Sequence, residues 1–79
     1  MKYVYILSSI AEPERFYVGL TDDLRERLAT HNDGSVRHTS KYRPWALKTY
    51  VAFSSPDKAV AFEKYLKSGS GRAFAKNRL

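Results

Sequence analysis

The sequence contains no cysteine, which excludes disulfide bridges, thiol nucleophiles and zinc sites with cysteine ligands. Its two histidines, His31 and His38, are too few for a metal site made of histidine alone. Long hydrophobic runs are also missing. The first apolar run, Tyr3 to Leu7, is too short for a signal-peptide core or a bilayer span. We therefore expect a cytoplasmic protein that has no membrane partner.

The chain is short but rich in apolar and aromatic residues. Its 79 residues are 43% hydrophobic and include six tyrosines, four phenylalanines and one tryptophan. This composition is typical of a folded domain and not of a disordered basic tail. Because two separate cores could not each bury enough surface at this length, we expect a single domain over residues 1–79.

Acidic residues become scarce after residue 34. Residues 1–34 contain four basic and six acidic residues, a balance of −2, whereas residues 35–79 contain ten basic and two acidic residues, a balance of +8. The net charge of +6 therefore arises from residues 35–79. Such a concentrated excess indicates an anionic partner, most commonly nucleic acid. A solubilising surface is the alternative that charge alone leaves open.

Three short segments rich in β-branched and aromatic residues predict strands: Tyr3–Ser8, Phe16–Leu20 and Trp45–Phe53. The first is apolar on both faces, as expected of a central strand. Gly19 lies inside the second and indicates a bulge or a point where another group approaches the backbone.

Helix signals separate and follow these strands. Asp23 is a predicted N-cap for a helix that ends at about His31, and Ser55-Pro56 begins a helix that ends at about Ser68. A short helix is expected over Arg72–Arg78, and residues 34–44 are expected to form a polar, basic loop. The order strand–strand–helix–strand–helix–helix predicts an α+β fold, with helices packed on a three-stranded sheet.

Polar residues fall on the apolar faces of these helices. At 100° per residue, Arg27 and His31 lie one turn apart on the side of Leu24 and Leu28. Glu63 lies within the apolar stripe of the next long helix, where a carboxylate needs an ion pair, hydrogen bonds or a metal ion.

Structural roles are the alternatives for these positions. Arg27 and Glu63 could form an ion pair between helices, and His31 could simply stabilise a helix C-terminus. Asn77 is expected on the packing side of Phe74. The segment Gly69-Ser70-Gly71 could bind a phosphate or serve as a plain connector.

The ordered set of motifs along the chain resembles the GIY-YIG nuclease family, in particular its small single-domain bacterial members. The matching segments are Tyr3-Val4-Tyr5, Tyr17-Val18-Gly19-Leu20-Thr21, Arg27-Leu28, His31-Asn32, Ser40 to Trp45, and Phe62 to Gly69. Tyr3 stands where the first motif of the family has glycine, and Val18 replaces isoleucine.

The resemblance implies an antiparallel sheet and hydrolysis of DNA phosphodiester bonds with a divalent metal ion, Mg²⁺ or Mn²⁺. The residues that match the catalytic positions of the family are Tyr5, Tyr17, Arg27 and His31, and Glu63 matches the metal ligand. Nearby cations would favour the phenolate of a tyrosine acting as base. Tyr17 is the preferred base or water-positioning group, with Tyr5 hydrogen-bonding the nucleophile or phosphate, although the two roles are interchangeable. His31 would orient the tyrosine or relay its proton.

The remaining basic residues are expected to bind the DNA backbone. This predicted set contains Arg37, His38, Lys41, Arg43, Lys67, Arg72 and Lys76, together with Asn77. Tyr42 and Trp45 could stack on bases, or Trp45 could anchor the core. The sequence thus predicts a DNA endonuclease of repair or processing, with specificity from DNA shape, a protein partner or a homodimer. A non-catalytic nucleic-acid-binding module is the main alternative, and a structural adaptor is another.

Overall fold

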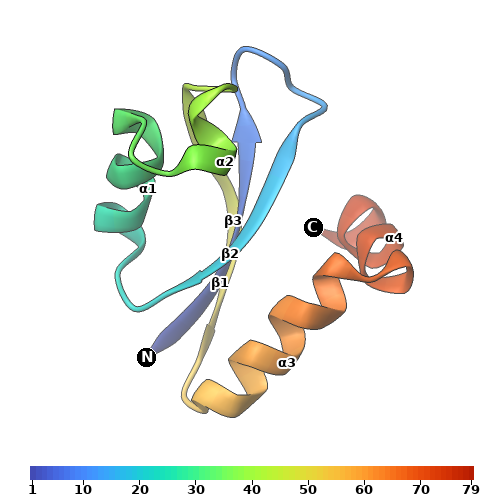
Figure 1. Cartoon of the computed structure of the whole chain (residues 1–79). Helices are drawn as coiled ribbons and strands as arrows, with labels where there is room; N and C mark the ends of the chain where they lie inside the picture. Colours follow the sequence, from blue (N-terminus) through green and yellow to red (C-terminus); the bar gives the residue numbers. More distant parts are fainter.

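Three antiparallel strands form a sheet with helices on both faces (Figure 1). The computed structural model describes residues 1–79. The strands are β1 (Lys2–Ser9), β2 (Phe16–Thr21) and β3 (Trp45–Phe53), in the spatial order β2-β1-β3. The helices are α1 (Leu24–Asp33), α2 (Arg37–Ser40), α3 (Pro56–Lys67) and α4 (Gly69–Arg78). The predicted α+β class and the order of the main elements are confirmed, and α2 is an additional element.

The central strand β1 is buried on both faces, as its apolar sequence predicts. Val4 and Ile6 pack with Ala59 and Leu66 on the α3 face of the sheet. The alternate residues of β1 pack with Trp45 and the leucines of α1 on the other face. Figure 1 shows the same division, with α1 and α2 on one side of the sheet and α3 and α4 on the other. Adjacent residues of β1 therefore pack into two different hydrophobic cores, one on each face of the sheet.

The helix boundaries follow local capping chemistry. The carboxylate of Asp23 accepts a hydrogen bond from the Glu26 amide at 3.0 Å and caps α1. Gly34, with a φ of 89°, ends α1 in the left-handed conformation, so the helix extends two residues beyond the predicted His31. Ser68 ends α3 at Lys67 because its backbone is extended.

The predicted loop over residues 34–44 is wrong in its middle, where the four-residue helix α2 forms. The amides of Thr39 and Ser40 both donate to the Val36 carbonyl, at 3.1 and 3.0 Å. Thr39 is 1% exposed beneath α1. The turn thus forms around a buried contact with a residue distant in the chain, which local sequence does not reveal.

The last helix begins at Gly69 and not at Arg72, because Ser68 caps it through a 3.1 Å hydrogen bond from the Gly71 amide. Gly71 is buried against α3, where a Cβ would lie 1.7 Å from the Tyr65 carbonyl oxygen. Gly71 therefore makes a close contact between the two helices. The packing side of α4 contains Gly71 and the partly buried Ala75, and Asn77 is exposed, contrary to the prediction that it shares a packing side with Phe74.

No helix in the structure is both long enough and apolar enough to cross a membrane.

Candidate active site

The hydroxyl of Tyr5 is the centre of a polar cluster between the sheet and α1. It lies 2.8 Å from Nε2 of His31 and accepts a 3.3 Å hydrogen bond from Nε of Arg27. Tyr5 is 2% exposed and His31 is fully buried. The helical spacing of Arg27 and His31 brings both side chains to the same hydroxyl, as their shared face predicts.

Thr39 completes this cluster from α2. Its Oγ1 lies 2.7 Å from Nδ1 of His31, so both ring nitrogens of the histidine have partners. The carbonyl of Thr39 in turn accepts a hydrogen bond from the Trp45 indole at 2.8 Å. Trp45 is 4% exposed and is therefore a core anchor, which excludes the alternative of base stacking. Sequence reasoning missed Thr39, since only its burial under His31 distinguishes it from the other hydroxyl residues nearby.

Tyr17 reaches the same cluster from the edge strand β2. It pairs with Leu7 in the sheet, so its side chain emerges on the face of Leu7 and Tyr5. Its ring centroid lies 4.8 Å from that of His31 and 6.3 Å from that of Tyr5. Two tyrosines, an arginine and a histidine that are distant in the chain are thus in mutual contact.

Gly19 allows the ring of Tyr5 to lie against the backbone of β2. The two residues are paired in the sheet, and a Cβ on Gly19 would lie 2.3 Å from both Cζ and the hydroxyl oxygen of Tyr5. Of the two alternatives for this glycine, the close approach is correct, and the β1–β2 register is regular.

The electrostatics of the cluster favour a protonated Tyr5. Burial raises the pKa of its phenol, and the hydrogen bond from Arg27 offsets this only in part. The same hydrogen bond is the main reason that the pKa of the Arg27 guanidinium rises. At Tyr5 burial therefore outweighs the neighbouring cation.

Glu63 lies on α3, across the sheet from α1, and is mostly buried, with its side chain 16% exposed. Its carboxylate contacts Nζ of Lys67 at 2.5 Å and forms no ion pair with Arg27, so the alternative of an ion pair between these helices is wrong. The charge of Glu63 nevertheless reaches the cluster. After burial and the Tyr17 charge, it is a further cause of the raised pKa of Tyr5.

Most of the chain also matches known proteins. Residues 1–77 match the GIY-YIG catalytic domain. The chain belongs to the GIY-YIG family. Two relatives, UPF0213 proteins of Streptococcus pyogenes serotypes M3 and M5, are each 36% identical over 72 residues, which cover 90% of this chain and 76% of the relative. GIY-YIG domains are generally nucleases, so the chain has a nuclease-type fold.

The predicted DNA-binding residues form two groups, one on each face of the sheet. The first group is exposed in α2 and the segment after it, on the α1 face, and contains Arg37, His38, Lys41 and Arg43. The second is exposed on α3 and α4 across the sheet and contains Lys67, Arg72, Lys76 and Asn77. Tyr42, the other residue considered for base stacking, has its ring covered by Arg15, whose Cζ lies 4.4 Å from the ring centroid. The two groups therefore do not form one continuous flat surface.

The buried His31 predicts that the stability of this GIY-YIG domain depends on pH. Burial, aided by the Arg27 charge, lowers the pKa of the imidazole below its usual 6.5. As the pH falls, the imidazole of the unfolded chain therefore binds a proton at a higher pH than the imidazole of the folded chain. The free energy of unfolding is expected to fall as pH drops below about 6.5. Below the lowered pKa of His31 in the folded state, this group causes no further fall in the free energy of unfolding.

Urea unfolding at pH 8 and pH 5 would measure this effect. His31→Gln is expected to weaken the pH dependence, whereas His38→Gln, at an exposed position of α2, should retain it. Titration of the His31 ring by NMR provides a second measurement if His31→Gln does not fold. An imidazole that titrates above 6.5 would contradict the prediction.

Proposed function

We propose that this protein is a divalent-metal-dependent DNA endonuclease that acts in DNA repair or processing, and that it works in the cytoplasm. The observation that carries the proposal is the Tyr5 hydroxyl, which contacts Arg27 and His31, lies beside Tyr17 and is influenced by the charge of Glu63. Phosphodiester hydrolysis needs a positioned water, a cation for the phosphate oxygens and a stabilised leaving group. This cluster offers groups suited to the first two requirements.

Arg27 is the proposed phosphate ligand. Nε of its guanidinium is engaged by Tyr5, and its planar fork leaves further donors for phosphate oxygens. Tyr17 is the proposed base or water-positioning group, because it belongs to the accessible edge strand, whereas Tyr5 is buried and favours its protonated form. Tyr5 would then hold Arg27 and hydrogen-bond the nucleophile or phosphate. His31 would orient Tyr5 and accept or return its proton.

Glu63 is the proposed ligand for Mg²⁺ or Mn²⁺. The structure contains no group of three histidine or acidic side chains that could hold a metal ion. A single carboxylate suits Mg²⁺, which retains several waters and commonly binds through one or two carboxylates together with substrate phosphate. Such an ion, when bound, stabilises charge on the phosphate and on the leaving oxygen.

Cleavage assays would test the proposal on supercoiled, nicked, branched and single-stranded DNA with Mg²⁺ or Mn²⁺. We expect cleavage of at least one substrate, and EDTA should abolish it. Arg27→Lys should reduce the rate at least tenfold, because lysine retains the charge and loses the fork geometry. Arg25→Lys, at an exposed position of the same helix, is the matched control.

The alternative function predicts a different outcome of the same assays. If no substrate is cut and binding remains, weakening as salt rises, the protein is a non-catalytic nucleic-acid-binding module. Cleavage that Arg27→Lys leaves at the wild-type rate would contradict the assigned role of Arg27.

A further inference from the structure

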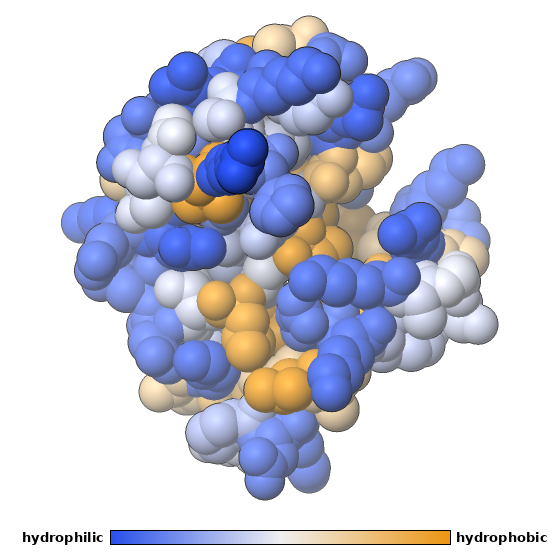
Figure 2. Space-filling model, in the orientation of Figure 1, coloured by the Kyte–Doolittle hydropathy of each residue, from blue (hydrophilic) through white to orange (hydrophobic).

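A hollow of about 880 Å³ lies on the α3 face of the sheet, between β2 and α4. Its apolar wall contains Ile6 and Val18 from the sheet and Leu66 and Ala75 from the helices. Figure 2 shows apolar surface, coloured orange, in the depression between the sheet and α4. The volume is within the usual range for ligand sites, about 300–1,000 Å³.

Positive charge surrounds this hollow. Four basic side chains line it, Lys48, Lys67, Arg72 and Lys76, against one carboxylate, Glu14. Only Lys67 has an ion-pair partner, Glu63, and the other three cations have none in the structure. The rim therefore carries a charge excess that complements an anionic ligand.

Phe16 adds an exposed aromatic ring to the same rim. It is 56% exposed, an unusual state for phenylalanine, and Nζ of Lys48 lies 5.0 Å from its ring centroid. An exposed ring next to cations is the arrangement that proteins use for unpaired nucleotides, whose bases stack and whose phosphates bind the cations. Bases within a duplex already stack on their neighbours and do not present a free face.

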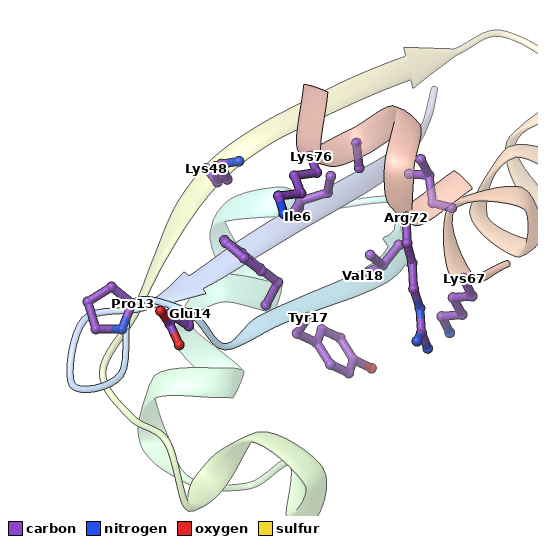
Figure 3. Close-up of a pocket in the computed structure, with 12 residues that line it drawn as sticks. Ile6, Pro13, Glu14, Tyr17, Val18, Lys48, Lys67, Arg72 and Lys76 are labelled. Atoms are coloured by element: carbon purple, nitrogen blue, oxygen red, sulfur yellow. The ribbon is translucent and has the colours of Figure 1, made fainter. Parts of the chain in front are cut away.

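Tyr17 links the hollow to the proposed reaction centre. This residue lines the hollow and also lies against His31 on the other face of the sheet. In Figure 3 its side chain points from β2 toward the ends of Arg72 and Lys67. Lys67, which lines the hollow, forms an ion pair with Glu63, the proposed metal ligand. A strand that leaves the reaction centre past the β2 edge would enter the hollow directly.

We propose that this hollow, the β2–α4 groove, binds one or two unpaired nucleotides of a DNA strand next to the scissile phosphate. The inference rests on the proposed function and specifies its substrate as DNA with unpaired nucleotides beside the cut. A second copy of the chain is a poor occupant because it also carries a net charge of +6. An acidic peptide would match the cations, but it would leave the exposed ring of Phe16 unexplained.

The test is fluorescence anisotropy in EDTA, so that binding is measured without cleavage. The two probes are a labelled DNA hairpin with a blunt end and the same hairpin with a four-thymidine overhang. Wild type is expected to bind the overhang probe about tenfold more tightly. Phe16→Ser and Lys76→Ser should remove this preference, and binding of the blunt probe should change less. The matched controls are Tyr50→Ser, an exposed aromatic residue on β3, and Lys58→Ser, an exposed lysine of α3 outside the groove.

Each outcome decides the proposal. Equal affinity for the two probes, or a preference that survives Phe16→Ser and Lys76→Ser, would overturn it. A labelled poly-glutamate peptide that binds the groove while the overhang adds no affinity would also overturn it, in favour of an acidic protein partner. An overhang preference without cleavage of any DNA would support the groove and contradict the nuclease proposal. Cleavage of DNA without an overhang preference would support the nuclease proposal and contradict the groove as a site for unpaired nucleotides.

Discussion

Glu63→Gln is expected to lower the rate of metal-dependent DNA cleavage by about 10³-fold. Glutamine retains the shape of the side chain and removes the negative charge that would hold the divalent ion. A metal ion contributes several kcal/mol of transition-state stabilisation, and each ~1.4 kcal/mol corresponds to a factor of ten in rate. The structure has no group of three or more histidine or acidic side chains that could hold the ion in place of Glu63.

The fold should tolerate this change, because the only ion-pair partner of Glu63 is the exposed Lys67 on the next turn of the same helix. Cleavage should be measured over a range of Mg²⁺ concentrations, with circular dichroism to verify folding. Asp57→Asn, an exposed change at the start of the same helix, is the matched control and should cleave at the wild-type rate. A folded Glu63→Gln protein that cleaves normally would contradict the assignment of Glu63 as the metal ligand.

Gly19→Ala is expected to destabilise the protein by about 1–3 kcal/mol and to reduce cleavage about 100-fold. The new Cβ would lie 2.3 Å from the hydroxyl end of Tyr5, so the ring must move. It has little space to move, because it is buried and its hydroxyl is bound by His31 and Arg27. The substitution thus separates Tyr5 from the two groups that it positions.

Urea unfolding and cleavage assays on the same samples would check both effects. Gly69→Ala is the matched control, since a Cβ at that position has no neighbour within 4 Å, and it should be neutral or slightly stabilising. Wild-type stability and activity in Gly19→Ala would show that the Tyr5 ring does not need its position against β2.

Much of the fold could be predicted from short-range patterns. The two-sided apolar sequence of β1 correctly indicates a central strand, and the range Trp45–Phe53 for the third strand is confirmed. The predictions that failed depend on packing. The helix α2 forms over the buried Thr39, and α4 includes Gly69–Gly71 because Gly71 contacts α3 closely.

In the candidate site, too, short-range patterns predicted some features correctly, and features that depend on packing could not be predicted. Helical periodicity places Arg27 and His31 on one inward face, and the structure brings both to Tyr5. Periodicity also places Glu63 inward, but it does not reveal that α1 and α3 pack on opposite faces of the sheet. It therefore left open an Arg27–Glu63 ion pair, which the structure excludes.

The sequence by itself determined the class of fold and the excess of positive charge after residue 34, because strand alternation, helix caps and charge are local properties. Its ordered motifs also determined the family. Only the tertiary structure decided that Thr39 holds His31 and that the basic residues divide between two faces of the sheet. It also decided that Phe16 and four cations surround one hollow beside Tyr17. These features depend on strand register and on which face of the sheet each helix covers, and no local pattern specifies either.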